Sequence, residues 1–199
     1  MKDSRSKFFA YLSRLRWIKR WGLMRNAESE NVMEHSWEVA VIAHLLAVIH
    51  NTHFGGDIDP NKVATAALFH DVSEVLTGDM PTPVKYYCPN LTNAYRQIEE
   101  IAKSELLKTL PLSLQTAYGT LINEQNLPDI HKKLIKAADT LSAYMKCLSE
   151  LRTGNIEFQI AANQLESNLK DIDLPEVIYF IENFVPDCQL PLDSLLKQK

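Results

Sequence analysis

Apolar side chains recur at steps of three and four residues along much of the chain, and the clearest stripe consists of Val39, Ile42, Leu46 and Ile49. Such spacing places the apolar residues on one face of an α-helix. We find no convincing period-two alternation of apolar and polar residues with turn dipeptides, which is typical of β-strands. The sequence therefore predicts an all-α protein.

Capping residues place the ends of two central helices. Asn31 and Glu34 have the spacing of a capping box, which predicts that a helix begins there. Asp59 followed by Pro60 predicts the N-terminus of a third helix, and Gly78 predicts its end. Further helices are predicted near 92–109, 113–124, 129–153, 156–170 and 174–184.

Composition indicates one globular domain over residues 1–199, because 46% of the residues are hydrophobic and 23% are charged. No apolar run approaches the roughly 18 residues of a membrane span, and the N-terminus lacks a secretory signal, so we expect a cytoplasmic protein. Cys88, Cys147 and Cys188 are widely separated, which argues against a disulfide scaffold or a thiolate zinc site.

Charge is distributed unevenly. Residues 1–25 hold eight Lys or Arg and one Asp, whereas the rest of the chain holds 13 basic and 24 acidic residues. Phe8, Leu12, Leu15 and Ile18 form an apolar stripe within this basic segment, so we expect it to be a helix of the core fold. The acidic remainder would repel a polyanion. A small anionic ligand therefore fits better than nucleic acid or a membrane surface.

Four ionisable residues fall on or beside predicted apolar helix faces. They are His35, four residues before Val39, the adjacent His70 and Asp71 in the third helix, and Asp139 in the sixth. Each alone can be a hydrogen-bonded core histidine or a helical aspartate in a salt bridge. Buried together they need a shared partner, because an unpaired buried charge costs several kcal/mol. Two imidazoles and two carboxylates suit a first-row divalent cation at a site that keeps water.

Two more carboxylates follow in the stretch HDVSEVLTGDMPTPVK. Glu74 is four residues after His70, so a continuous helix would project it onto the same side, where it could take a proton from water. The alternative is an exposed glutamate at a helix end. Asp79 follows Gly78 in a loop that could fold back over the site as a general acid or substrate contact. Its alternative role is turn capping.

Arg20 and Trp21 end the first predicted helix. Arginine can bind phosphate through paired hydrogen bonds, and an indole offers a flat wall for a sugar or base. Alone, this pair is weak evidence, because tryptophan is usually a core residue and arginine is usually solvated.

The order His35, His70-Asp71, Asp139 resembles the H…HD…D signature of the HD-domain metal-dependent phosphohydrolases, which are helical. The segments RWGLMRN, ENVMEHS, HDVSEVLTGDMPTPVK and KAADTLSAYMKCLSE resemble the bacterial HD-domain 5'-deoxynucleotidases of YfbR type along essentially the whole chain. The resemblance implies a single HD-domain helical bundle with a divalent metal between helices. It also implies a homodimer that hydrolyses 2'-deoxyribonucleoside 5'-monophosphates and rejects ribonucleotides.

The resemblance also implies roles for individual residues. It makes His35, His70, Asp71 and Asp139 the metal ligands, with His35 and Asp139 also touching the substrate, and the metal is cobalt, manganese or copper. Glu74 becomes the activator of the attacking water, and Asp79 a substrate contact near the leaving oxygen. Arg20 orients the phosphate, and Trp21 packs where a 2'-hydroxyl would clash. The nucleotide is bordered by Thr82, Pro83, Val84 and Lys85.

Other readings share this set of residues. An HD phosphodiesterase, or a hydrolase of nucleoside polyphosphates, would use the same ligands without needing Arg20 and Trp21. A degenerate HD domain that only binds a nucleotide or a partner protein would have lost a ligand or the base, and none is lost here.

Overall fold

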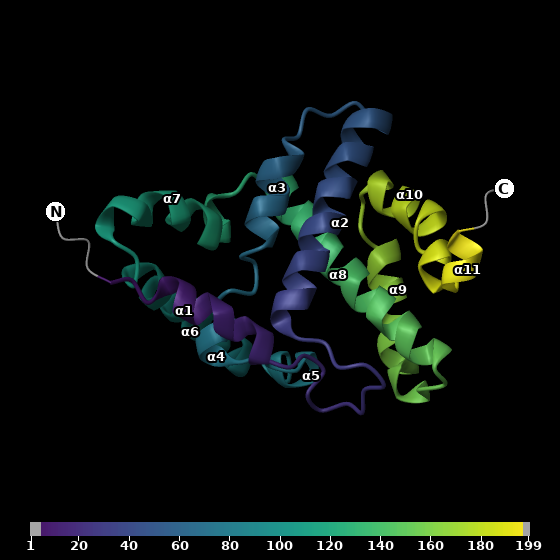
Figure 1. The fold of residues 1–199 in the computed structure, drawn as a ribbon, viewed down its shortest axis with the longest axis horizontal. Helices are drawn as coiled ribbons and strands as arrows, with labels where there is room; N and C mark the ends of the chain where they lie inside the picture. The colour runs from purple at the N-terminus through teal and green to yellow at the C-terminus, as the bar shows by residue number, and fades with distance from the viewer. Residues whose placement is uncertain (1–4, 197–199) are drawn as a thin grey trace.

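The computed structural model describes residues 5–196, apart from the side chain of Glu124, and this part of the chain is helical (Figure 1). The β-type backbone pairing in the described residues is limited to one isolated antiparallel bridge between Lys19 and Asn31. The predicted all-α class is confirmed. The α-helices are α1 (Phe8–Leu12), α2 (Val32–His53), α3 (Pro60–Ala67), α4 (Glu74–Thr77), α5 (Thr82–Lys85), α6 (Pro89–Lys108), α7 (Leu112–Ile122), α8 (Asp129–Arg152), α9 (Gln159–Lys170), α10 (Pro175–Asn183) and α11 (Leu192–Leu195). The 3-10 helices are η1 (Ser13–Trp17), η2 (Glu124–Asn126), η3 (Ile156–Phe158) and η4 (Pro186–Gln189).

Helix α2 lies at the centre of the fold and packs against α3, α8 and α10 (Figure 1). It begins with the predicted capping box. The Asn31 side chain accepts hydrogen bonds from the backbone N–H groups of Met33 and Glu34, both at 3.0 Å, and the Glu34 carboxylate accepts one from the N–H of Asn31 at 3.2 Å. These bonds satisfy N–H groups that a helix N-terminus would otherwise leave unpaired.

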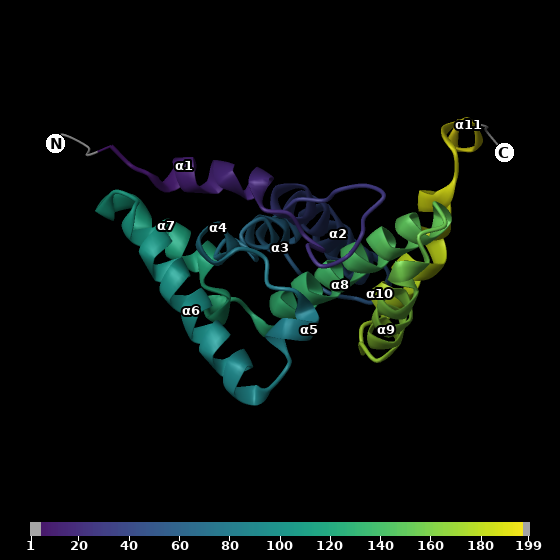
Figure 2. The same ribbon diagram turned by 90° about the horizontal axis from the view of Figure 1, so that it is seen from below.

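Two helical arms extend from this centre (Figure 2). One contains α6 and α7, which pack with α1 around a small apolar cluster that includes Phe8, Leu106 and Ile122. The other contains the C-terminal part of α8 with α9 and α10. The main core joins α2, α3, α8 and α10 through fully buried side chains such as Leu46 and Leu141. The first helix differs from the prediction, because only Phe8–Leu12 is α-helical and Ser13–Trp17 is a 3-10 helix.

The predicted third helix is interrupted, and this is the main difference from the sequence pattern. Asp59 caps α3 as expected, but α3 ends at Ala67, and regular α-helix resumes only at Glu74. In a continuous helix the Ala67 carbonyl would accept the N–H of Asp71. Here that carbonyl is contacted by the N–H of His70 at 3.3 Å and by the His70 ring Nδ1 at 2.7 Å. The imidazole thus takes over a carbonyl that the helix would have used.

This interruption determines where His70 and Asp71 point. Successive residues of a regular helix face directions about 100° apart, so neighbours do not meet. In the turn between α3 and α4, His70 Nε2 lies 3.1 Å from the Asp71 Oδ2 atom. The broken helix therefore allows two adjacent side chains to reach one point.

Helix α2 is long and apolar enough to meet the length and composition criteria of a membrane-spanning helix, so the expectation that no run approaches this length is wrong. More than half of its apolar window, 56%, is buried within the fold. Such burial is what a central core helix of this kind shows. The basic residue Lys2 and the acidic Asp3, which contributed to the predicted charge asymmetry, lie outside the described residues.

Candidate metal centre

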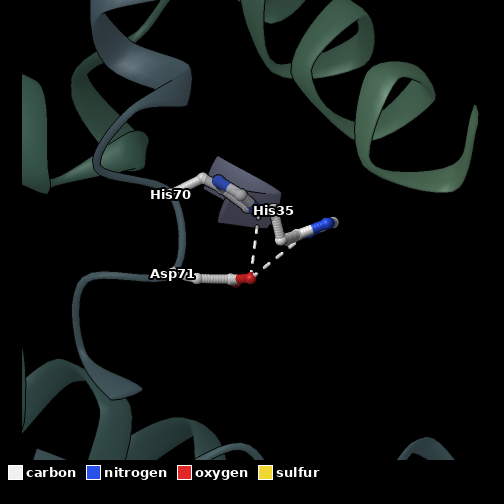
Figure 3. Close-up of side chains that lie close together, drawn as sticks. All are labelled: His35, His70 and Asp71. Atoms are coloured by element: carbon white, nitrogen blue, oxygen red, sulfur yellow. Dashed lines mark ion pairs between the residues drawn. The ribbon is translucent and has the colours of Figure 1, made fainter. Parts of the chain in front are cut away.

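His35, His70 and Asp71 converge on one point between α2 and the turn that follows α3 (Figure 3). One ligand atom from each of the three lies within 4.8 Å of the others. The Asp71 Oδ2 atom is 3.1 Å from His70 Nε2 and 3.6 Å from His35 Nε2. Asp139 on α8 adjoins the group, with its Oδ1 atom 3.2 Å from His35 Nε2. The structure thus brings together all four residues that the sequence singles out as metal ligands.

Hydrogen bonds on the far side of each imidazole orient its Nε2 toward the cluster. The Ser142 hydroxyl donates to the Glu38 carboxylate at 2.5 Å, so its oxygen is left to accept from His35 Nδ1 at 3.1 Å. The Ala67 carbonyl likewise accepts from His70 Nδ1. In the neutral form of each imidazole these partners place the proton on Nδ1, which leaves the lone pair of Nε2 for a metal ion. This arrangement of outer partners is typical of metal-binding histidines.

The two Nε2 atoms are buried and have no hydrogen-bond partner among the residues that the structure describes. Leaving a buried polar atom unpaired costs about 1–3 kcal/mol, so such atoms need an explanation. Two imidazole nitrogens beside two carboxylates form a donor set that suits a divalent transition-metal ion. The residues present therefore fit a metal site.

The electrostatics of the cluster favour positive charge. Burial lowers the pKa of the His70 imidazole, but the Asp71 carboxylate beside it outweighs burial and raises that pKa to about 9. Burial opposes ionisation of Asp71 and Asp139 too, yet the neighbouring histidines, and Lys136 in the case of Asp139, hold both pKa values well below their usual range. The site keeps its carboxylates ionised and stabilises a cation among them.

Glu74 lies at the start of α4 and is buried, with 8% of its surface exposed. Burial, together with the nearby charges of Asp71 and Asp79, raises the pKa of its carboxyl group to about 10. The exposed helix-end alternative for Glu74 is wrong, because the interrupted helix turns this residue inward. Burial also raises the pKa of Asp79, which lies beyond Gly78 within the influence of Arg20.

Arg20 and Trp21 meet the cluster through a shared carboxylate. The Glu30 Oε2 atom lies 3.4 Å from Arg20 Nε and accepts a 2.8 Å hydrogen bond from the Trp21 indole N–H, and Oε1 lies 3.6 Å from His35 Nδ1. A second guanidinium nitrogen of Arg20 is 3.4 Å from Asp71 Oδ2. The Trp21 ring packs on the Phe158 ring, with the two ring centroids 5.3 Å apart. The backbone of Trp21 has a φ of 57°, which is uncommon for a bulky residue.

The segment after Gly78 contains a short helix, α5, where the sequence suggested only a loop. Thr82, Pro83 and Val84 are exposed on it, whereas Lys85 is half-buried and forms a 2.8 Å ion pair with Glu99 on α6. Of these four residues, Lys85 also lines a cavity that His70, Asp71 and Asp139 border. The structure therefore places Lys85 next to the cluster, whereas Thr82, Pro83 and Val84 are exposed and are not among the residues that line the cavity.

Residues 7–188 match the family described as 5'-deoxynucleotidase YfbR-like. The chain belongs to the YfbR-like family. A 5'-deoxynucleotidase from Cronobacter sakazakii is 48% identical over 192 residues, which span 96% of this chain and 96% of that protein. The resemblance inferred from the motifs is confirmed.

Solved HD-domain structures share the fold of this YfbR-like protein. An HD-domain phosphohydrolase from Listeria innocua superposes with a TM-score of 0.81 at 25% identity, over 92% of this chain and 88% of that chain. A cyanophage S-2L HD phosphohydrolase, solved with dA and one catalytic Zn²⁺ ion, superposes with a TM-score of 0.61 at 21% identity, over 89% of this chain and 96% of that one. The predicted HD-domain helical fold is confirmed.

Two charged residues of this YfbR-like site were missed from the sequence. Glu30 precedes the cap of α2 in a non-helical segment, and no periodicity marks it. Lys136 donates a 2.7 Å hydrogen bond to Asp139 Oδ2, one helical turn away on α8. The three-residue spacing of Lys136 and Asp139 could have predicted this pair.

Proposed function

We propose that this YfbR-like protein is a metal-dependent phosphomonoesterase, a single HD domain over residues 1–199 that hydrolyses 2'-deoxyribonucleoside 5'-monophosphates to deoxynucleosides and phosphate. The observation that carries the proposal is the pair of buried, unpartnered Nε2 atoms of His35 and His70 beside Asp71 and Asp139. Family membership and the 5'-deoxynucleotidase from Cronobacter sakazakii support the choice of substrate.

His35, His70, Asp71 and Asp139 would hold the cation, and His35 and Asp139 would also border the substrate phosphate. A divalent cation, when bound, supplies Lewis acidity for the phosphate and lowers the pKa of water. It also offsets the charge of Asp71, which adds to burial in raising the pKa of Glu74. Glu74 accepts a proton from the attacking water. Arg20, held between Glu30 and Asp71, contacts the phosphate and balances the charge of the transition state.

Asp79 contacts the substrate near the leaving 5'-oxygen. Burial raises the pKa of its carboxyl group, which favours the protonated form that can donate a hydrogen bond or a proton to that oxygen. Thr82, Pro83 and Val84 on the exposed side of α5 border the nucleotide, and Lys85 borders it from within the adjacent cavity.

Trp21 sets the preference for deoxyribose by occupying the space that a 2'-hydroxyl would need. Its indole is held by the hydrogen bond to Glu30 and by packing on Phe158, so it is a fixed wall. The Trp21→Ala variant should reduce the ratio of kcat/KM for deoxy over ribo 5'-monophosphates by about tenfold, as expected for a steric contact of this kind. Trp17→Ala, at an exposed tryptophan, is the matched control. An unchanged ratio in Trp21→Ala would move the selectivity elsewhere.

The proposal extends to the metal and the assembly. The native cation is cobalt, manganese or copper, and the protein acts as a cytoplasmic homodimer. Trp37, Val41 and Val48 form an exposed apolar stripe on α2 that a second copy could cover. If so, Trp37→Asp should shift the protein toward monomer in analytical ultracentrifugation, whereas Phe9→Asp on α1 should not.

One experiment tests the activity. The protein is stripped with a chelator, reloaded with single divalent metals, and assayed for phosphate release from paired deoxy and ribo 5'-monophosphates. Cyclic and 3'-phosphates and nucleoside polyphosphates are included to detect the rival activities. We expect metal-dependent release from the deoxy 5'-monophosphates. No release from any of them, with any metal, would overturn the proposal.

A further inference from the structure

A cavity of about 220 Å³ opens beside the metal centre, between α6 and α8. His70, Asp71 and Asp139 form its inner wall, and four lysines line the remainder together with Glu99, Ser73, Leu127 and Ile135. The lysines are Lys85, Lys103, Lys132 and Lys136. A water molecule occupies about 30 Å³ in the liquid, so the space can hold a phosphate group and several waters.

The charge of this cavity differs from that of the protein. The whole chain has a formal net charge of −4, whereas the cavity lining holds four lysines against the carboxylates of Asp71, Glu99 and Asp139. A divalent cation at the metal centre would add two further positive charges to this wall. The cavity is therefore a local positive region on an acidic protein, and it suits an anion.

Two of the four lysines, Lys103 and Lys132, have no paired carboxylate within the cavity lining. Lys85 and Lys136 pair with Glu99 and Asp139, which lie in the same cavity. Lys103 and Lys132 instead pair with Glu100 and Asp129, which are not among the residues that line the cavity.

The burial of Lys103 strengthens this point. Only 14% of its side-chain surface is exposed, and its partner Glu100 is 46% exposed at 3.1 Å. An ion pair with a partner so open to water contributes little, so it leaves most of the lysine's charge available to another anion.

We propose that this cavity binds a second phosphate group, and that the protein thereby binds deoxynucleoside 5'-diphosphates in addition to monophosphates. The first phosphate lies at the metal centre and Arg20, and the distal phosphate lies against Lys103 and Lys132. The inference rests on the proposed function for the position of the first phosphate. Arg20 reaches Asp71 but is not among the described residues that line the cavity, so the two cationic groups serve different phosphates.

The lining favours an anion over the nucleoside part of the substrate. Nucleoside and other small-molecule pockets are lined mostly by apolar and aromatic side chains. Leu127 and Ile135 are the apolar residues in this lining, and the others are charged or polar. A base or sugar would desolvate the lysines without pairing them, whereas a phosphate group pairs with them directly.

The test compares the wild type with two double variants. Lys103→Gln/Lys132→Gln removes the two unbalanced charges, one from α6 and one from α8. Lys108→Gln/Lys133→Gln removes exposed lysines from the same two helices outside the cavity and is the matched control. Calorimetry on metal-free protein measures binding of inorganic phosphate and pyrophosphate, so neither chelation nor turnover interferes. A second arm measures inhibition of monophosphate hydrolysis by deoxyadenosine 5'-diphosphate in the metal-loaded enzyme.

We expect wild-type protein to bind pyrophosphate more tightly than phosphate. The ratio of the two affinities should fall about tenfold in the Lys103/Lys132 variant, or about threefold per lysine, and stay at the wild-type value in the control. The inhibition arm should show the same loss for the diphosphate. Thermal unfolding of each variant checks that it is folded.

Equal affinity ratios in all three proteins would overturn the proposal. Displacement of pyrophosphate by free deoxyadenosine would also overturn it, because the cavity would then hold the nucleoside. Failure of the proposed function has a different signature, namely no monophosphate hydrolysis by the wild type. The binding ratios in metal-free protein can still be measured in that case.

Discussion

Two buried clusters of charged residues lie three turns apart on α8, and they differ in how completely their polar atoms are paired. Glu150, which is 1% exposed, accepts hydrogen bonds from the backbone N–H groups of Ala27 at 2.8 Å and Glu28 at 3.1 Å, from the Asn155 amide at 2.8 Å, and from Lys146. The Asp139 cluster, in contrast, contains two imidazole nitrogens without partners among the described residues. The carboxylate of Glu150 is thus fully paired within the protein, whereas the Asp139 cluster requires a ligand to pair its nitrogens.

The fully paired Glu150 cluster holds in place a segment whose residues contact the Asp139 cluster. By binding the N–H groups of Ala27 and Glu28, the Glu150 carboxylate fastens the non-helical segment that carries Arg20, Trp21 and Glu30. Satisfied buried polar groups rigidify a structure, whereas unsatisfied ones mark strain or function. The same type of substitution should therefore have opposite effects in the two places.

Glu74→Gln should have the largest effect on activity. The amide has nearly the same shape but cannot take a proton, so kcat should fall about 10²- to 10⁴-fold, the usual contribution of a general base. Because the pKa of Glu74 is raised to about 10 in the metal-free protein, its carboxyl group is neutral at pH 7, and the neutral amide should preserve stability. Steady-state kinetics measures kcat, urea unfolding measures stability, and calorimetry measures metal affinity. Retained activity would remove Glu74 from the reaction.

Glu150→Gln should chiefly affect stability. It replaces a charged acceptor of several hydrogen bonds and leaves Lys146, whose side chain is 10% exposed, without its carboxylate. Breaking a buried pair in this way costs about 3 kcal/mol of unfolding free energy. Urea denaturation measures the change. Glu166→Gln, at an exposed pair with Lys170, should change stability by less than about 0.5 kcal/mol. Similar small losses of unfolding free energy in Glu150→Gln and Glu166→Gln would contradict the structural role assigned to the Glu150 cluster.

The pH dependence of stability should separate Glu150 from other acids. Burial opposes its ionisation, but the bond from Lys146 and those from the backbone lower its pKa to about 2. A carboxyl group whose folded pKa is lowered stabilises the fold above its unfolded pKa, and that contribution disappears as the pH falls through the folded pKa. Unfolding curves between pH 5 and pH 2 should therefore show a smaller loss of stability in Glu150→Gln than in the wild type. Parallel curves would contradict this assignment.

The difference between the clusters also explains what the sequence could and could not predict. The four candidate ligands were found because helical periodicity makes a polar residue on an apolar face conspicuous, and the helix caps at Asn31 and Asp59 are local patterns. The interruption after Ala67 involves a hydrogen bond from the His70 ring to the Ala67 carbonyl, a local competition with the helix that apolar periodicity does not reveal. Glu30, Lys85 and Lys103 lie on elements that carry none of the four candidate ligands, so no spacing in the sequence relates them to the metal centre.

Glu30 offers a smaller and more selective test of how the two clusters are joined. Its carboxylate contacts Arg20, Trp21 and His35, so we infer that it is a positioning residue for all three. Glu30→Gln keeps an oxygen that can accept from the Trp21 indole but loses the charge that holds Arg20. It should raise KM about tenfold, by weakening one charged contact to the phosphate, and retain the preference for deoxyribose.

Glu30→Ala removes both contacts and should lower the deoxy-to-ribo ratio of kcat/KM as well, because Trp21 is then free to move from a backbone conformation with φ of 57° that few residues adopt unaided. Glu28→Gln, at an exposed neighbour in the same segment, is the control. A general structural role for Glu30 would lower kcat/KM for deoxy and ribo substrates equally in both variants. Loss of selectivity in the alanine variant alone would show that the carboxylate acts on Trp21 through its hydrogen bond and on Arg20 through its charge.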